Sequence, residues 1–402
     1  MDKSADLPAR LHFIIVPYYD SPLVLRFPLG RSVPSRLPFA PCFETSRKNV
    51  LKAKPAFATR PALPVAVVIP FYNGSDTIER AVRSVLEQSA APAEFVVVDD
   101  GSRAEEGAAL DALAERLGFR VLHTQNGGQG AARNAGVAST TAPYICFLDQ
   151  DDFFLGHHIR DLSRAVPRND PHFGWVYGEL FEAEGDGSVV RTSIVTHHAR
   201  HPKTDVIDLI KGDMFVLPSA ALVSREAFEA VGGFDPQFTG YEDDDLFLRI
   251  FRAGYTNHFT PKAVTVWCIH SESTSYSPKM ALSRFRYFRK LVGMFPDDEA
   301  KGRFFVRDMI IPRFQEIFLS EAIEAATRRE GKYAANRETY LRLAADYVAI
   351  IRDQPTVSGF FKWRLGLHLR ALDSRHARRI YHLRPTVTRL RAAIRGLTRP
   401  SR

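Results

Sequence analysis

Short apolar runs alternate with amphipathic segments in the middle of the chain, and this alternation predicts strands and helices in turn. The run Val65–Ile69 is continuous and largely β-branched, as expected for a strand buried on both faces, and it stops at Pro70. Similar runs follow at 94–98, 120–123 and 144–148. Strands and helices that alternate through short connections are typical of a parallel, doubly wound sheet with right-handed crossovers. We therefore predict an α/β fold.

Helical spacing of apolar residues predicts the segments that cover such a sheet. Helices are predicted over 76–88, 104–117, 225–231, 314–326 and 340–351, with another that follows the glycine-rich stretch 126–136. Between 173 and 192, two apolar runs flank a Gly-Asp-Gly turn, which predicts a β-hairpin.

Composition places the chain among soluble globular proteins, with 45% hydrophobic and 25% charged residues in 402. No apolar run approaches the ~20 residues of a membrane span. No export signal is evident, and three widely spaced cysteines show no metal-binding pattern. We therefore expect a cytoplasmic protein without membrane helices.

The formal charge of +8 is unevenly distributed. Residues 1–60 carry ten Lys and Arg against four acids, residues 61–359 carry 32 against 41, and residues 360–402 carry twelve against one. Residues 1–64 also hold ten of the 25 prolines, which indicates an extended or partly disordered leader or an over-long gene start. We predict three parts: this leader (1–64), an α/β domain (65–276) and a helical extension with a basic tail (277–402).

Three carboxylates, those of Asp149, Asp151 and Asp152, directly follow the apolar run 144–148. Carboxylates so close together repel one another unless a cation lies among them. Mg²⁺ and Mn²⁺ usually take one or two protein carboxylates and fill their other positions with water and substrate phosphate. The cluster follows a strand, where open α/β sheets bind ligands, so it predicts a nucleotide or nucleotide-sugar site. Taken alone, the hexapeptide 147–152 is explained equally well as a solvated acidic turn.

The other predicted strands also end in polar turns, whose side chains should gather along one edge of the sheet. The set comprises Tyr72, Asn73, Asp99, Asp100, Arg133, Asp149 and Asp151. Taken singly, Asn73 and Asp99 can be helix caps. The run NGGQG at 126–130 matches neither a Walker loop nor a dinucleotide fingerprint, which disfavours sites for ATP and for dinucleotides.

Four further acids, Glu242 to Asp245, head an apolar segment with helical spacing. Acids in the first turn complement the helix dipole, but capping explains only one or two of them. Between these acids and the hairpin lies a polar segment, 197–204, with three histidines. Its irregular spacing favours a solvent-exposed or acceptor-lining loop over a metal site.

Five segments together resemble the family 2 glycosyltransferases of GT-A fold, which are nucleotide-sugar-dependent and mostly inverting enzymes. They are VVIPFYNG (67–74), VVVDDGS (96–102), NGGQGAARNAG (126–136), ICFLDQDD (145–152) and GGFDPQFTGYEDDDLFLR (232–249). They occur in the family's order and cover residues 65 to about 276. The resemblance implies a GT-A type doubly wound mixed sheet flanked by helices, and it does not extend to the helical extension.

The resemblance also implies roles for individual residues. The nucleotide-binding set is Pro70, Tyr72, Asn73, Asp99, Asp100, Arg133 and Asp149, with Asp149 facing the ribose. Asp151 would hold Mn²⁺ or Mg²⁺, with Asp152 behind it. His270 stands where some members complete the metal site, and a structural histidine is an equal alternative.

Glu242 and Asp243 match the family's catalytic acidic pair, in which the aspartate is the usual base. Many members have a tryptophan after this pair, where the chain has Asp244. The additional charge leaves the choice among Asp243, Asp244 and Asp245 open, and Asp243 is the prediction.

The implied activity is that of a metal-dependent inverting glycosyltransferase of hexosyltransferase type, acting in envelope or exopolysaccharide assembly. It would move one sugar from a nucleotide diphosphate sugar, with UDP favoured, to a hydroxyl of a saccharide or lipid-linked acceptor. A metal stabilises the leaving diphosphate, and a carboxylate among crowded acids accepts the proton of the acceptor. No second nucleophile is evident, which predicts inversion. The alternative is a non-catalytic GT-A-like protein that binds a nucleotide sugar or a saccharide.

The segment 360–397 interleaves aromatic and aliphatic residues with Lys and Arg. A basic amphipathic helix is typical of elements that bind an anionic membrane surface, here the inner face of the membrane. A solvated helix packed on its own domain is an equal alternative. No recognition motif for nucleic acid accompanies the charge, so we expect no nucleic-acid partner.

Overall fold

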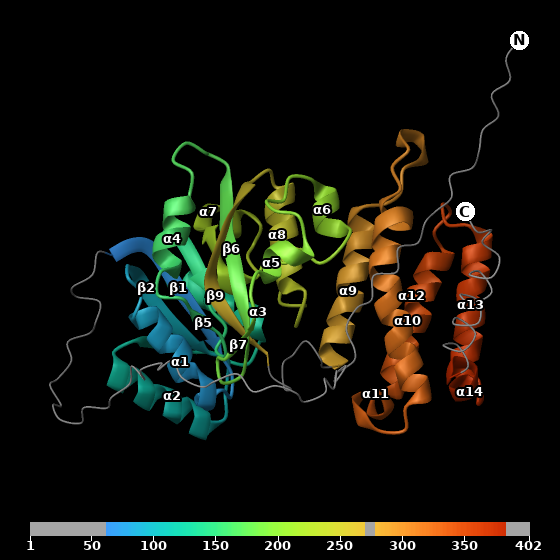
Figure 1. Cartoon of the computed structure of the whole chain (residues 1–402), viewed down its shortest axis with the longest axis horizontal. Coiled ribbons are helices and arrows are strands. Elements are labelled where there is room, and N and C mark those ends of the chain that lie inside the picture. Colours follow the sequence, from blue (N-terminus) through green and yellow to red (C-terminus); the bar gives the residue numbers. More distant parts are fainter. Residues whose placement is uncertain (1–61, 270–277, 383–402) are drawn as a thin grey trace, which may run out of the picture. The chain divides into compact units, whose positions relative to one another are not determined.

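The computed structural model of the chain describes residues 62–269 and 278–382 (Figure 1). All of the described residues belong to the same compact unit. The strands are β1 (Ala62–Phe71), β2 (Ala91–Asp99), β3 (Arg120–His123), β4 (Tyr144–Phe147), β5 (Phe153–Phe154), β6 (Phe173–Glu184), β7 (Val189–Arg191), β8 (Ala221–Ser224) and β9 (Thr256–Ile269). The helices are α1 (Ser75–Leu86), α2 (Ala104–Leu117), α3 (Gln129–Ala138), α4 (His158–Ala165), α5 (Ile194–His198), α6 (Val206–Ile210), α7 (Arg225–Ala230), α8 (Glu242–Arg252), α9 (Pro278–Met294), α10 (Ile311–Thr327), α11 (Gly331–Ala335), α12 (Arg337–Arg352), α13 (Gly359–Asp373) and α14 (Ala377–His382).

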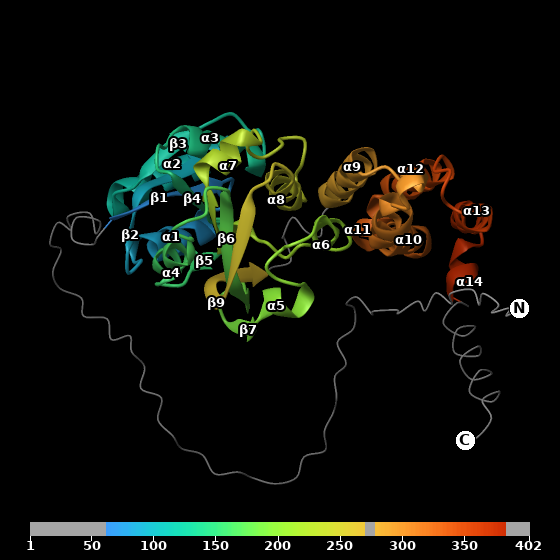
Figure 2. The ribbon, with the colours of Figure 1, turned by 90° about the horizontal axis from the view of Figure 1, so that it is seen from above.

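Within residues 62–269 the strands form one nine-stranded mixed sheet. Its order is β3-β2-β1-β4-β8-β6-β9-β5, with β7 paired to β6. β1, β2, β3 and β4 are mutually parallel, whereas β8 runs antiparallel to both β4 and β6. Figure 2 shows helices on both faces, with α1 and α4 on one and α3 and α7 on the other. The predicted α/β fold with a mixed, doubly wound sheet is therefore confirmed.

The first strand extends beyond the prediction at both ends. β1 begins at Ala62 and continues through Pro70 to Phe71, so the prediction that it stops at Pro70 was wrong. Pro70 donates no hydrogen bond, but it lies in register with Val98, and the carbonyl of Phe71 accepts a hydrogen bond from the amide of Asp100 at 2.8 Å. The parallel pairing with β2 thus continues past the proline.

The long strand β9 was not predicted, because its sequence is half polar and contains Pro261. Its pairing with β6 steps from Thr260 to Ala263 and leaves Pro261 in the irregularity between them. A proline in a strand is tolerated at such a bulge because the strand donates no ladder hydrogen bond there.

Helix α3 lies against β1 so closely that Gly136 has no room for a side chain. A Cβ atom there would lie 2.3 Å from Cγ1 of Val68 and 3.0 Å from Cγ2 of Val98. The glycine therefore fixes the distance of α3 from the parallel strands and so the position of the helix start, Gln129, beside the strand ends.

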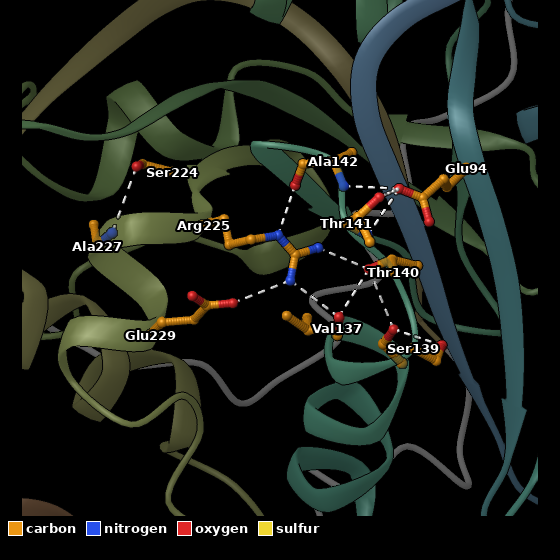
Figure 3. Close-up of polar contacts among 11 residues, drawn as sticks. Glu94, Val137, Ser139, Thr140, Thr141, Ala142, Ser224, Arg225, Ala227 and Glu229 are labelled. Carbon is orange, nitrogen blue, oxygen red and sulfur yellow. Dashed lines mark hydrogen bonds and ion pairs between the residues drawn. The ribbon is translucent and has the colours of Figure 1, made fainter.

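The connection from α3 to β4 is held by Arg225, the first residue of α7 (Figure 3). Its guanidinium donates hydrogen bonds to the carbonyls of Val137 at 3.0 Å and Ala142 at 2.7 Å, and to the hydroxyl of Thr140 at 2.8 Å. A cation here satisfies carbonyls that the end of α3 leaves open. Glu94 binds the same connection from β2 and accepts from the amide of Ala142 at 2.7 Å. The start of β4, which leads to the acidic loop, is thereby fixed.

Helices α9 to α14 form the helical extension, in which α10 and α12 pack side by side (Figure 1). Aromatic rings fill the space between its helices, with Phe288 of α9 4.9 Å and Phe318 of α10 5.0 Å from the ring of Tyr347 of α12. The helices predicted over 314–326 and 340–351 are confirmed in α10 and α12. α13 and α14 lie in the predicted amphipathic segment, whose residues from 383 on are outside the described part. None of the described helices is long and apolar enough to cross a membrane.

The close approach at Gly136 gives a test of this packing. Gly136→Ala should lower the free energy of unfolding by about 1–3 kcal/mol, because the added methyl group overpacks the contact with Val68. The matched control is Gly293→Ala in α9, where a Cβ meets nothing within 4 Å. There the same change should raise the free energy of unfolding by up to about 1 kcal/mol. Urea denaturation of both variants measures the two effects, and a shift of the same sign in both would contradict the packing described.

Candidate functional site

Arg133 of α3 joins two acidic segments that are far apart in the sequence. Its Nη2 lies 2.5 Å from Oδ1 of Asp149, and its Nη1 lies 3.1 Å from Oε1 of Glu242. The arginine is only 2% exposed and stacks over the ring of Phe234. Burial lowers the pKa of Arg133, but the charges of Asp149 and Glu242 outweigh burial and raise the pKa above its usual value. The loop after β4 and the start of α8 therefore belong to one site.

The acidic loop after β4 also contacts the turn after β1. Gln150 accepts a hydrogen bond from the amide of Tyr72 at 2.8 Å and donates one to the carbonyl of the same residue at 3.3 Å. A Cβ on Gly74 would lie 2.3 Å from Nε2 of the Gln150 side chain, so a larger residue at position 74 would displace this side chain. On its other side the loop is held by Gln129, which donates to Asp149 at 2.8 Å.

Arg80 of α1 fastens the end of this loop to β9. Its Nη2 donates to the carbonyl of Asp151 at 2.7 Å and to Sγ of Cys268 at 3.3 Å, and its Nη1 donates to the carbonyl of Gly185 at 2.9 Å. The buried Asp152 accepts from the amide of Cys268 at 2.9 Å. Burial, together with the neighbouring carboxylates, raises the pKa of Asp152 well above its usual value. Asp152 therefore anchors the loop from within the protein.

Of the two predicted metal ligands, only Asp151 lies in the described part. His270 lies outside the described residues, one position beyond the end of β9 at Ile269. Among the residues that the structure describes, no group of three or more His, Cys, Asp and Glu side chains is placed to hold a metal ion. The hard carboxylate of Asp151 fits Mg²⁺ or Mn²⁺, which take one or two protein carboxylates and complete their shell with water and phosphate.

The predicted nucleoside aspartates both have partners inside the protein and are 4% exposed. Asp99 accepts from the amide of Ser102 at 3.0 Å, and its other oxygen lies 2.9 Å from Nδ1 of His123. Asp100 accepts from the amides of residues 127 and 128, both at 2.8 Å. These bonds fix the shape of the two turns, and the nucleotide-binding role of both aspartates stays a prediction.

The three predicted residues of the first turn have different surroundings. Pro70 is buried within β1. Asn73 has a left-handed backbone with φ of 48°, its amide donates to Ser102 Oγ at 3.0 Å, and its Oδ1 accepts from the amide of Arg103 at 2.9 Å. Tyr72 is 50% exposed. Of the three, Tyr72 is the most exposed and Asn73 is partly buried.

Asp244 and Asp245 bind cations of the helical extension. Asp244 forms an ion pair with Arg313 of α10, which also lies 3.1 Å from Asp213. Asp245 is fully buried and lies 2.6 Å from the ammonium of Lys290 of α9. Both carboxylates are thus engaged in fastening α8 to α9 and α10.

Asp243 differs from its neighbours because it forms no ion pair within the described ranges. One of its oxygens accepts from the amide of Asp244 at 2.8 Å. Burial, followed by the charges of Asp244 and Glu242, raises the pKa of Asp243 well above its usual value. Of the three aspartates left open by the sequence, Asp243 thus differs in forming no ion pair within the described ranges, and its role as the base stays a prediction.

The turn before α8 is held by the same extension. Ser283 of α9 donates to the carbonyl of Gly240 at 2.5 Å and accepts from the amide of Thr239 at 3.1 Å. Tyr241 has a left-handed backbone with φ of 64°, and its ring lies 5.4 Å from that of Tyr287 of α9. A non-glycine residue in this region is strained, so the contacts with α9 hold the conformation from which α8 starts.

The three histidines between 197 and 201 do not converge. The prediction of a loop over 197–204 was wrong for its first two residues, because α5 extends to His198. The first residue of this helix, Ile194, is buried. Nδ1 of His197 and Nδ1 of His198 each bond a carbonyl four residues earlier. His201 instead lies 2.6 Å from the hydroxyl of Tyr177. The three side chains thus bond separate partners.

Sequence reasoning missed four residues that hold the site together. Arg80, Lys290 and Arg313 lie outside the matching segments, and Gln129 lies inside the segment 126–136 without having been singled out. Only the partner of Asp244 could have been expected from the sequence. Asp244 stands where many family members have a tryptophan, and a buried acid at that position requires a cation nearby. Nothing in the sequence says which of the chain's 54 Lys and Arg supplies it.

Comparison with protein families identifies two matching segments. Residues 66–232 match the model of glycosyl transferase family 2, and residues 219–271 match that of the N-terminal domain of galactosyltransferase. An uncharacterized glycosyltransferase of Rickettsia conorii is 28% identical over 222 residues, which are 52% of this chain and 35% of the relative. The pre-mycofactocin glycosyltransferase of Mycobacterium tuberculosis is 30% identical over 211 residues, 50% of this chain and 42% of that one. The chain thus spans less than half the length of these relatives.

Among solved structures, S. aureus TarS 1–349 in complex with UDP-GlcNAc resembles the chain with a TM-score of 0.53. The likeness covers 80% of this chain and 91% of that one, at 16% sequence identity. At this identity it supports the shared fold alone.

The surroundings of Asp244 predict a dependence of stability on pH. Burial raises the pKa of Asp244 to about 6, although the charge of Arg313 acts in the opposite direction. The folded chain therefore keeps a proton at pH values where the unfolded chain, with an ordinary aspartate pKa near ~4, has released it. Stability from this group is present below pH ~4 and is lost as the pH rises to about 6.

Relative to Asp244→Asn, the wild type should lose up to about 3 kcal/mol of unfolding free energy between these two pH values. Urea denaturation of both proteins across the range measures the difference. Parallel curves for wild type and variant would contradict the assignment.

Proposed function

We propose that the chain, whose residues 66–232 match the model of glycosyl transferase family 2, is a metal-dependent inverting enzyme that transfers one sugar from a nucleotide diphosphate sugar. The observation that carries this proposal is the bridge from Arg133 to Asp149 and Glu242. It places the loop with the predicted donor ligands beside the helix with the predicted base. Transfer of a sugar between two bound substrates requires that the groups binding the donor and the base acting on the acceptor lie close together.

On the donor side, Asp149 would face the ribose, Asp151 would hold Mn²⁺ or Mg²⁺, and Tyr72 would contact the nucleoside. The metal, when bound, stabilises the charge that develops on the leaving diphosphate. The complex of the structural neighbour TarS with UDP-GlcNAc supports a donor of this class and favours uridine as the base. His270 remains the proposed second protein ligand.

On the acceptor side, Asp243 would take the proton of a hydroxyl as the oxygen attacks the anomeric carbon. One C–O bond forms from the acceptor while the bond from that carbon to the diphosphate breaks on the opposite face. The proton goes to Asp243 and the nucleoside diphosphate leaves, so the configuration at the anomeric carbon is inverted. Glu242 keeps Arg133 in place and acts through it.

The acceptor in this proposal is a saccharide or a lipid-linked saccharide, as in envelope or exopolysaccharide assembly, on the cytoplasmic side. The pre-mycofactocin glycosyltransferase among the relatives is also a glycosyltransferase, which supports the class of reaction.

The donor site is tested by isothermal titration of nucleoside diphosphates and nucleotide sugars, with Mn²⁺ and with EDTA. We expect one nucleotide to bind only with metal, and Asp151→Ala to weaken it at least about tenfold, since even groups around metal ligands contribute that much. Asp346→Ala, on an exposed position of α12, is the matched control and should bind as the wild type does. Folded protein that binds no nucleotide in the panel would refute the donor site.

The base is tested by Asp243→Asn, which keeps the shape of the side chain and removes its proton affinity. We expect kcat for transfer to fall by about 10²–10⁴, with donor affinity unchanged. Donor binding by wild type without transfer to any saccharide or lipid-linked acceptor would instead favour the non-catalytic binding protein. An unchanged kcat in the variant would refute Asp243 as the base.

A further inference from the structure

Helix α13 presents a stripe of large apolar side chains to solvent. Phe360, Trp363 and Leu367 are 69%, 58% and 41% exposed and follow one another at spacings of three and four residues. The rings of Phe360 and Trp363 stack with their centroids 5.8 Å apart. Residues at this spacing share one face of a helix, so the three form a continuous surface, which we call the apolar stripe.

The opposite face of α13 is already buried against the extension. Leu365 and Leu372 are 1% and 2% exposed, and Leu372 packs with Ala322 of α10 and Ala344 of α12. α13 is therefore apolar on two sides, a pattern of helices that are covered on both. Among the residues that the structure describes, only the inner side is covered.

Cations flank the apolar stripe. The guanidinium of Arg364 stacks on the ring of Phe361, one position from the stripe, and Arg370 is exposed one turn beyond Leu367. Arg352 of α12 lies over Gly366, where a Cβ would come within 2.6 Å of its Nη2. In the sequence from 360 to 402, twelve Lys and Arg accompany a single acid, Asp373.

We propose that the apolar stripe and its flanking arginines dock the chain onto an anionic lipid bilayer, with α13 lying in the plane of the headgroups. Aromatic and aliphatic side chains between cations are the composition by which interfacial helices bind such membranes. With 15 residues and several charges, α13 is too short to span one.

Two other occupants could cover the stripe: the segment 383–402 of the same chain or a second copy of the chain. Charge favours the anionic bilayer over both. Residues 383–402 carry six arginines and no acid, so covering the stripe with this segment would bring like charges together. Pairing two copies through the stripe would do the same. An anionic bilayer complements both the helix and the segment that follows it. The inference goes beyond the proposed transfer reaction and does not rest on it, because the stripe and the nucleotide site share no residue.

The test uses the full chain and vesicles of phosphatidylcholine with or without phosphatidylglycerol. We expect the wild type to sediment with the anionic vesicles and not with the neutral ones, and to be released by salt. Phe360→Ser, Trp363→Ser and Leu367→Ser in one variant should weaken binding by roughly tenfold or more. The matched control is Val189→Ser with Val190→Ser, an exposed apolar pair on β7, which should bind as the wild type does.

Trp363 supplies a second readout, because the emission of a tryptophan shifts to the blue as it leaves water. The difference between wild type and Trp363→Phe should show this shift with anionic vesicles only. Nucleotide binding as tight as that of the wild type shows that the stripe variant is folded. If the wild type itself binds no nucleotide, an unchanged far-UV circular dichroism spectrum shows the same.

Three results would overturn the proposal. The first is that the stripe variant binds anionic vesicles as tightly as the wild type, or that the wild type binds neither kind of vesicle. The second is that Trp363 of the full chain is shielded from acrylamide without vesicles, which would mean that residues 383–402 cover it. The third is that the wild type is a dimer that the stripe substitutions dissociate, which would assign the surface to a second copy.

Discussion

A buried guanidinium between two carboxylates is the interaction on which the arrangement of the site depends. Arg133 is 2% exposed and bonds Asp149 on one side and Glu242 on the other. Removal of one partner of a buried ion pair typically costs about 3–5 kcal/mol, because the remaining charge is left in an apolar environment. The arginine therefore fixes α3, the loop after β4 and the start of α8 in one geometry.

The helical extension completes this arrangement from the other side of α8. Arg313 pairs with Asp244 and Lys290 pairs with Asp245. These two acids, which helix capping does not explain, therefore have partners more than 40 residues away in the sequence. With these two paired, Asp243 is the aspartate at the start of α8 that forms no ion pair within the described ranges. The extension is thus part of what shapes the site, and variation in α9 and α10 should change α8 as well.

The sequence was sufficient for what depends on local pattern and insufficient for what depends on distant partners. Continuous β-branched runs predicted the parallel strands, and the polar turns after them predicted the edge where Asp149 and Arg133 meet. The pairing of Asp244 with Arg313 could not be predicted, because any Lys or Arg of the chain satisfies the same requirement. β9 was missed because Pro261 and its polar residues hide a strand that tolerates them at a bulge.

The central claim is that Arg133 couples the two acidic segments, and a double-mutant cycle measures this coupling directly. The free energy of unfolding is determined for wild type, Arg133→Met, Glu242→Gln and the double variant. A contact in one buried network predicts an interaction energy of roughly 1–3 kcal/mol, with the double variant less damaged than the two single changes together. Additive effects of the two substitutions would contradict the account, because they would mean that Arg133 does not couple the loop after β4 to the start of α8.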